Sequence, residues 1–301
     1  MKKNENVAAI DIGSHNCRLI IAKKNKNFKK VVFNRSQPTN LIKNLSFNNE
    51  FNFENITKTL DCLNFFKNKL DKFNVSKYRC VATEACRTAI NSDFFLNEVK
   101  KMSNLDIEII SSEEEARLCL KSCKDYLNLI NETGFLFDIG GGSTETTFFK
   151  NKPLHFSTTS IAYGVINLPE KIEIHGSTKI FKKIYDHIIF FYNSHKNFSN
   201  SLVTIGSCST MTTICSIFLN LSYYDTKKIE GVEMQLNDVV KTIKNIKNIN
   251  FEDLKKHPCI GNKYNLLLNG IKILEQLIKV VPIKKIIVTQ KGLRDAIIDE
   301  L

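Results

Sequence analysis

Residues 135–149, FLFDIGGGSTETTFF, contain two short apolar runs separated by a glycine-rich polar turn. Apolar runs bounded by turn residues are typical of β-strands, so we expect strands at 134–139 and 144–149. A similar arrangement occurs at residues 8–22, AAIDIGSHNCRLIIA, where an aspartate again precedes the turn. The two aspartates, Asp11 and Asp138, are about one domain length apart. The repeat therefore predicts a duplicated domain.

Strand and helix patterns alternate along the rest of the chain, which predicts an α/β fold. Apolar residues recur at helical spacing between Glu54 and Phe73, so an amphipathic helix is expected there. We expect further strands at 7–12, 18–22, 78–82, 107–111, 201–205 and 284–288, a hairpin end at 23–30, and helices at 92–102, from Ser112, at 177–195, after Ser209, at 264–280 and from Gly292. No linker rich in Pro, Gly or Ser divides the chain. We expect domains at 1–122 and 123–301, with the final helix, 291–301, a candidate to pack back on the first domain.

The composition excludes several classes of protein. Apolar residues make up 43% of the 301 residues and charged residues 25%, which is ordinary for a globular protein and excludes a disordered or collagen-like chain. No run of about 18 apolar residues occurs, and the nine cysteines form no CxxC pair. We therefore expect a cytoplasmic protein without a membrane partner, a disulfide framework or a zinc ribbon.

The net charge of +12 suggests a polyanionic partner. Lysine and asparagine are enriched along the whole chain, however, so the charge reflects a compositional bias as much as a binding surface. We expect no nucleic-acid partner. Only six basic residues are arginines, and a lysine-rich chain that keeps arginine can be using its planar fork for phosphate or carboxylate contacts.

The turn at 138–145, DIGGGSTE, carries the strongest chemical signal. Successive glycines let several backbone N–H groups approach an anion without side-chain clashes, which suits phosphate. A tight hairpin turn is about equally consistent with three glycines alone. The carboxylates of Asp138 and Glu145 at both edges favour the phosphate interpretation, because Mg²⁺ or Mn²⁺ beside a phosphate requires oxygen ligands. The first copy supplies a second turn, from Asp11 to Asn16, and two facing turns would form a cleft.

Several segments together resemble a known family. The turns DIGS and DIGGGST, with VATEACRTAIN (81–91), IEIISSEEEARL (107–118), SIAYGVINLPEKI, TIGSCSTMTTI and GLRDAII, are similar in order and spacing to the exopolyphosphatase/guanosine pentaphosphate phosphatase family. This family belongs to the actin-like ATPase superfamily. The resemblance implies two related actin-like (ribonuclease H-like) domains with the active site in an interdomain cleft.

The resemblance also implies roles for individual residues. Glu115 matches the general base that activates water, although Ser112 and Glu115 also have the spacing of a helix capping box. Arg87 matches an arginine that stabilises the transferred phosphoryl group. Glu114 is a second acid for metal or water, with a solvated role about as plausible, and Arg117 and Arg294 are expected in structural ion pairs. The expected phosphate contacts are Gly13, Ser14, His15, Asn16, Arg18, Gly140, Gly141, Gly142, Ser143 and Thr144, and the expected metal ligands are Asp138, Glu145 and Asp11. For Arg18, an ion pair with a neighbouring strand is nearly as plausible.

The implied activity is Mg²⁺-dependent release of terminal phosphate from inorganic polyphosphate. Hydrolysis of guanosine pentaphosphate, a kinase or ATPase reaction, and a non-catalytic sensor of alarmone or polyphosphate are the alternatives, and a homodimer is compatible with the sequence. The chain departs from the family pattern at 35–47, at Lys263–Asn265, at 207–210 and at Gln290. Lysines 23, 24, 26, 29 and 30 beside the first hairpin favour the linear polyanion through their summed field.

Overall fold

The computed structural model describes residues 5–25, 28–127, 133–150, 154–195 and 202–301. The chain forms two compact units. The first unit combines the residues up to Leu118 with Gly292–Leu301, and the second is Cys119–Lys291. The first boundary lies within a helix, α5 (Ser112–Ser122), whose end is the expected boundary at residue 122. Over the ranges given above, no helix is long and apolar enough to cross a membrane.

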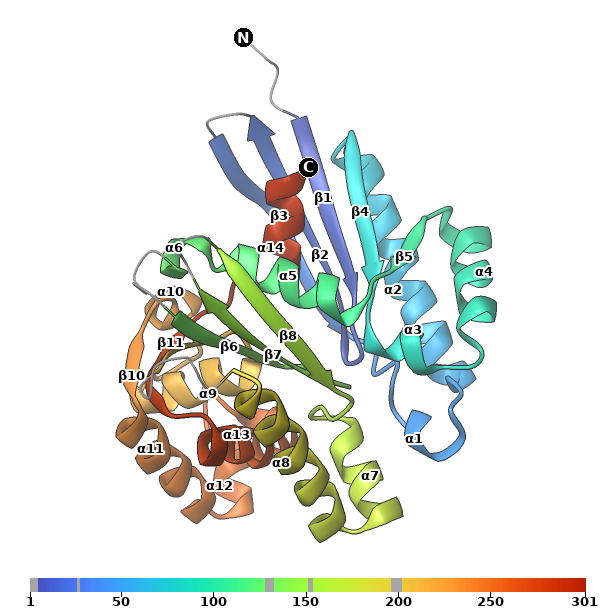
Figure 1. Cartoon of the computed structure of the whole chain (residues 1–301). Coiled ribbons are helices and arrows are strands. Elements are labelled where there is room, and N and C mark those ends of the chain that lie inside the picture. The colour runs from blue at the N-terminus through green and yellow to red at the C-terminus, as the bar shows by residue number, and fades with distance from the viewer. Residues whose placement is uncertain (1–4, 26–27, 128–132, 151–153, 196–201) are drawn as a thin grey trace. The chain divides into compact units, whose positions relative to one another are not determined.

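The first unit contains a five-stranded mixed sheet in the order β3-β2-β1-β4-β5. The three-stranded antiparallel part is followed by two parallel strands (Figure 1). The strands are β1 (Glu5–Ile12), β2 (Asn16–Asn25), β3 (Phe28–Pro38), β4 (Lys77–Ala82) and β5 (Ile107–Ile109). The helices are α1 (Leu45–Asn48), α2 (Phe53–Lys72), α3 (Glu84–Thr88), α4 (Ser92–Ser103), the first part of α5, and α14 (Leu293–Glu300).

The last helix completes the core of this unit. Side chains alternate along a strand, so Val7 and Ala9 of β1 share one face of the sheet. They form a buried cluster with Ala296, Ile297 and Ile298 of α14, which packs on β1 (Figure 1). Lys24 fixes the end of α14 by donating to the carbonyl oxygens of residues 298 and 299 at 2.8 and 2.9 Å.

The second unit repeats this topology. Its six-stranded sheet has the order β10-β11-β9-β6-β7-β8, so five strands follow the pattern of the first unit and β10 adds an antiparallel edge. The strands are β6 (Thr133–Ile139), β7 (Thr144–Lys150), β8 (His155–Ile161), β9 (Leu202–Gly206), β10 (Glu233–Gln235) and β11 (Ile283–Val288). The duplication expected from the two hairpins is therefore present in the whole sheet.

Helices surround a large apolar core in the second unit. Phe135 and Phe137 of β6 and Phe148 of β7 are fully buried among isoleucines of the helices. The helices are α6 (Lys124–Leu127), α7 (Asn167–His175), α8 (Ser177–Asn193), α9 (Ser209–Phe218), α10 (Thr226–Ile229), α11 (Leu236–Asn248), α12 (Phe251–Lys256), the 3₁₀-helix η1 (Gly261–Lys263) and α13 (Tyr264–Val280).

Some elements differ from the expectation. Strand β2 begins at Asn16, two residues early, so the first turn consists of residues 13–15. Strand β5 ends at Ile109, and the strand expected from residue 201 is described from Leu202 onward, since Ser201 lies outside the described residues. The expected hairpin end at 23–30 leads into the edge strand β3, whose side chains are mostly exposed.

Candidate functional site

The two turns close in the same way. In the second unit the N–H of Gly140 donates to the carbonyl oxygen of Ser143 at 2.9 Å, and in the first unit Gly13 donates to Asn16 at 3.0 Å. The residues just outside each turn are paired across their strands in the same register. The sequence similarity of the two turns therefore corresponds to one backbone conformation used twice.

Neighbouring groups bind the carbonyl oxygens of the glycine turn. Val165 N donates to Gly140 O at 2.9 Å, Ile166 N donates to Gly141 O at 2.9 Å, and the side chain of Asn167 donates to Gly142 O at 2.7 Å. The N–H groups of Gly141, Gly142 and Ser143 form no hydrogen bond with any described residue. Peptide groups whose oxygens are bound on one side present their N–H groups on the other, which is the arrangement that binds anions.

Gly164 allows this close approach. A Cβ atom at this position would lie 2.4 Å from the carbonyl carbon of Gly141 and 2.5 Å from Gly142 N. Asn167 also accepts from Gly164 N at 2.8 Å. Neither Gly164 nor Asn167 stands out in the sequence by itself, although both belong to the segment SIAYGVINLPEKI that carries the family resemblance.

The first turn is held by the loop that follows β3. Ile42 N donates to Ser14 O at 3.1 Å, and the N–H groups of Thr39 and Asn40 both donate to His15 O at 2.9 Å. The His15 ring nitrogen Nδ1 lies 2.6 Å from Asn40 Oδ1. The altered segment 35–47 thus supports the first turn through its backbone and through the side chain of Asn40, whose φ of 53° is one that asparagine tolerates.

Carboxylates flank both turns, with different partners. Asp11 lies opposite Arg18 in the β1–β2 pair, and their charged groups are 3.4 Å apart. Asp138 lies opposite Glu145 in the β6–β7 pair. Glu145 is 3% exposed, and its Oε1 accepts from Ser160 Oγ at 2.8 Å. The second pair thus places two carboxyl groups at the edge of the glycine turn, where the first pair has an aspartate and an arginine.

The described ranges contain no cluster of three or more His, Cys, Asp or Glu side chains that could hold a metal ion. Two carboxylates nevertheless fit Mg²⁺, because this ion is commonly held by one or two carboxylates with water and substrate phosphate as its other ligands. The ligand role expected for Asp11 stays a prediction, and its described partner is Arg18.

Helices α3 and α5 bring the two expected catalytic residues together. Arg87 Nη1 donates to Glu115 Oε2 and to the Ile110 carbonyl oxygen, both at 2.9 Å. Ser111, and not Ser112, caps α5, since its Oγ accepts from Glu114 N at 3.1 Å. The capping-box alternative for Ser112 and Glu115 is therefore wrong in its register. Glu115 points instead to Arg87.

Glu114 belongs to a separate network of ion pairs. It accepts from Arg117 at 2.6 and 2.9 Å and from Arg79 at 3.1 Å. These hydrogen bonds, chiefly that from Arg117, lower the pKa of Glu114. Arg117 also pairs with Glu300 of α14 at 2.9 Å, so the structural ion pair expected for Arg117 is present. The network ties α5 to α14.

Arg294 differs from this expectation. It donates to Asn34 Oδ1 at 3.0 Å but forms no ion pair with a described residue. Burial, followed by the positive charge of Arg18, lowers its pKa. The prediction of an ion pair is thus wrong for Arg294, because its helix directs it toward β3 and Arg18 instead of a carboxylate within contact distance.

The lysines of the first hairpin lie far from the turn. Lys24 is eight residues along β2 from Asn16, which at about 3.3 Å per residue is a separation of roughly 25 Å. Lys24 caps α14, and Lys29 pairs with Asp299 at 2.5 Å. Lys26 lies outside the described residues. These described lysines thus lie on the hairpin at the end away from the turn, and their contribution to substrate choice stays a prediction.

The other altered positions serve the second unit. Gln290 donates to Glu230 through its backbone and to the Thr226 carbonyl oxygen through its side chain, at 2.8 and 2.9 Å. Tyr264 packs edge-on against Phe251, with ring centroids 4.6 Å apart. Gln290 therefore holds a loop of the second unit in place, and Tyr264 contributes to its packing.

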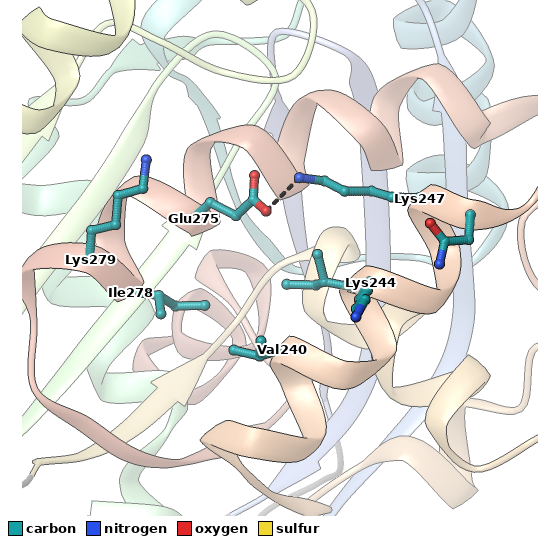
Figure 2. A pocket seen from close by; sticks show the side chains of 8 residues that line it. Val240, Lys244, Lys247, Glu275, Ile278 and Lys279 are labelled. Atoms are coloured by element: carbon teal, nitrogen blue, oxygen red, sulfur yellow. Dashed lines mark hydrogen bonds and ion pairs between the residues drawn. The ribbon is translucent and has the colours of Figure 1, made fainter.

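A shallow groove of about 470 Å³ lies between α11 and α13 of the second unit. Figure 2 shows Val240 and Ile278 beside Lys244 and Lys279, with an ion pair between Lys247 and Glu275. None of its lining residues belongs to the turns or the carboxylate pairs described above.

Comparison with known proteins identifies the relatives of this chain. The model of the Ppx/GppA phosphatase family matches residues 20–301. The chain is 28% identical over 294 residues to a bifunctional 3-dehydroquinate synthase/phosphatase of Fusobacterium nucleatum, covering 92% of this chain and 44% of that protein. It is 26% identical over 309 residues to a candidate exopolyphosphatase of Haemophilus influenzae, covering 98% of this chain and 91% of that protein. The chain thus spans less than half of the Fusobacterium protein.

Solved structures agree on the fold. The crystal structure of the Aquifex aeolicus member of the Ppx/GppA protein family has a TM-score of 0.78 to this chain at 27% identity, with 98% of this chain and 97% of that one covered. The expected actin-like fold with two related α/β domains is confirmed.

Proposed function

Because this chain belongs to the Ppx/GppA phosphatase family, we propose that it is a phosphoanhydride hydrolase that releases terminal phosphate from inorganic polyphosphate. The observation that carries this proposal is the contact between Arg87 and Glu115 at 2.9 Å. A protein that only binds phosphate needs the positive charge of an arginine such as Arg87, but no carboxylate beside it. A hydrolase also needs a carboxylate that can take a proton from water.

In the proposed reaction, a water oxygen attacks the terminal phosphorus and gives its proton to Glu115. The bond from that phosphorus to the bridging oxygen breaks, which releases orthophosphate and leaves the chain one phosphate shorter. Arg87 stabilises the negative charge on the oxygens of the transferred group, as arginine does in other phosphoryl-transfer enzymes.

The two turns would bind substrate phosphate through backbone N–H groups. The bound carbonyl oxygens of Gly140, Gly141 and Gly142 support this role, since they leave the N–H side of the turn available to an anion. Arg18 adds a cation next to the first turn. We propose that Ser14, Asn16, Ser143 and Thr144 complete these contacts.

We further propose that Asp138 and Glu145 hold Mg²⁺, or Mn²⁺ in its place. The ion would neutralise the paired carboxylates and charge on the substrate phosphate. The position of Glu145 directly opposite Asp138 supports this assignment, because Mg²⁺ is commonly held by one or two carboxylates together with water and substrate phosphate.

Polyphosphate is preferred over guanosine pentaphosphate because the chain matches a candidate exopolyphosphatase along almost the full length of both. The described lysines of the first hairpin lie at the end away from the turn, so they add little to this choice. Tyr264, which replaces part of an Arg-Ala-Asp segment that the family resemblance leads us to expect, packs against Phe251 and so offers less surface to a nucleobase.

The test is phosphate release by the purified chain from polyphosphate, guanosine pentaphosphate and ATP at equal concentrations of terminal phosphate, with Mg²⁺. We expect release from polyphosphate to be fastest. Faster release from the guanosine substrate would establish the alarmone phosphatase instead. Binding without release from any substrate would indicate a sensor, and phosphoryl transfer from ATP to an acceptor would indicate a kinase.

A further inference from the structure

Glu84 contacts Arg87 on the side away from Glu115. Glu84 begins the short helix α3, and its Oε2 accepts from Arg87 Nε at 3.3 Å and from Nη2 at 3.1 Å. Its other oxygen, Oε1, accepts from Thr88 Oγ1 at 3.1 Å. The carboxylate is thus held by two residues of its own helix, at helical spacings that bring side chains together.

The guanidinium of Arg87 therefore has described partners on every nitrogen. Nε and Nη2 bind Glu84, while Nη1 binds the Ile110 carbonyl oxygen and Glu115. The side chains of Glu84, Arg87 and Glu115 are 14%, 18% and 19% exposed, so solvent screens these contacts only in part. One cation lies between two carboxylates.

We propose that Glu84 is a positioning residue that holds the guanidinium of Arg87 in the orientation in which its Nη1 donates to Glu115. This inference rests on the proposed function, in which Arg87 and Glu115 act on the phosphoryl group and water. An arginine without Glu84 can turn its planar fork and bind Glu115 through two parallel hydrogen bonds. Such a bidentate pair would stabilise the carboxylate form of Glu115 and make it a weaker base for water.

The charges around Arg87 decide whether replacing Glu84 favours or disfavours ionisation of Glu115. Arg87 is faced by Glu84 from α3 and by Glu115 from α5, and the adjacent Glu114 is engaged by Arg79 and Arg117. The negative charge of Glu84 disfavours ionisation of Glu115, and removing it favours ionisation. A variant without this charge should therefore keep Glu115 ionised to lower pH.

The test compares Glu84→Ala, which removes charge and acceptor, with Glu84→Gln, which keeps an acceptor oxygen. For Glu84→Ala we expect kcat to fall about tenfold without a rise in KM, and the acid limb of the kcat/KM profile to move to lower pH by roughly one unit, the scale of a nearby charge. Glu84→Gln should recover part of kcat. Thr88→Ala should shift the limb in the same direction by less.

Glu108→Gln is the matched control. Glu108 forms a similar contact with Arg79, at 2.9 and 3.0 Å, on an exposed part of the first unit. Its removal should leave kcat and the pH profile unchanged. A loss of kcat in Glu84→Ala with an unmoved acid limb would show a merely structural role and overturn the proposal.

A second readout does not depend on turnover. The chain has six arginines, so the Nε–H signals of labelled arginine can be assigned by NMR. We expect hydrogen exchange at Arg87 Nε to accelerate at least about tenfold in Glu84→Ala, as expected when a protected hydrogen bond is lost. Unchanged exchange would overturn the positioning role even in an active enzyme. If the wild type showed no turnover, the proposed function would be wrong. The hydrogen-exchange measurement would still decide whether Glu84 positions Arg87.

Discussion

Arg18 and Glu145 occupy equivalent positions in two copies of one hairpin. Each lies directly opposite an aspartate across the strand pair, Arg18 opposite Asp11 and Glu145 opposite Asp138. The first pair joins an acidic and a basic residue, whereas the second joins two acidic residues. The duplicated hairpins therefore share a backbone register but differ in the chemistry of their side chains.

Replacing Glu115 with Gln should reduce kcat for polyphosphate at least about a hundredfold, because the amide cannot accept a proton from water. Binding should persist, since the turns and Arg87 remain. Steady-state kinetics and equilibrium binding together check this. Glu113→Gln provides the control, because Glu113 is an exposed residue of the same helical turn. Near wild-type kcat in Glu115→Gln would remove Glu115 from the mechanism.

Asp138→Asn and Glu145→Gln should abolish Mg²⁺-dependent activity. We expect Mg²⁺ to raise the melting temperature of the wild type and to leave that of each variant unchanged. Asp186→Asn, at an exposed site of α8, is the control for general charge removal. Retention of the Mg²⁺ response in both variants would place the metal elsewhere.

Gly164→Ala should weaken phosphate binding at the glycine turn. The added methyl group must displace the backbone of Gly141 and Gly142, and overpacking of this kind typically costs about 1–3 kcal/mol. Gly134→Ala is the matched control, since its Cβ would lie 2.3 Å from the Phe149 ring at the other end of β6. Both variants should lose stability in urea, but only Gly164→Ala should raise KM. An equal effect on KM would show that the turn is not specially involved.

Removing the lysine charges of the first hairpin should have little effect on a short substrate. The double variant Lys23→Gln and Lys30→Gln should change KM for tripolyphosphate less than twofold, because charges roughly 25 Å away are screened at a Debye length of about 8–10 Å. Arg18→Gln should raise the same KM clearly. A rise in KM caused by the lysine changes alone would indicate that the substrate binds along β2.

Alkaline pH should destabilise the protein. Burial raises the pKa of Cys123 and of Cys215 to about 12, from 9.0 for an ordinary thiol. The unfolded state therefore loses its thiol protons first, and each thiol's contribution is intact below pH 9 and falls by about 1.4 kcal/mol per pH unit between 9 and 12. Urea unfolding at pH 7.5 and pH 10 measures this. Cys123→Ala should show a smaller loss between the two pH values than the wild type, and an equal loss would contradict the assignment.

The sequence predicted most of the elements that face a core. The hairpins around Asp11 and Asp138 and the helix at 264–280 carry clear apolar periodicity, and the structure has them. Strand β3 was not predicted over its length, because an edge strand with exposed side chains has no alternating pattern. Helix α11 could have been found, since Val239, Ile243 and Ile246 recur at helical spacing.

The candidate site was only partly predictable. The glycines and carboxylates of the second turn are local signals, and the resemblance supplied Glu115 and Arg87. Contacts between distant segments left no such signal: Asn167 holds Gly142 from 25 residues away, and Arg87 meets Ile110 across 23 residues. The distance of the lysines from the first turn follows from strand length, which the apolar pattern underestimated.

Residues 292–301 belong to the first unit although they follow the whole of the second. On the ribosome, β1 and β4 are therefore made early, yet the apolar face containing Val7, Ala9 and Val81 waits for Ala296–Ile298 before it is covered. The second unit has no such dependence and can fold as soon as its own residues leave the exit tunnel. We therefore expect the first unit to complete its core only after the second has been synthesised, and its apolar face to be prone to aggregation in the interval.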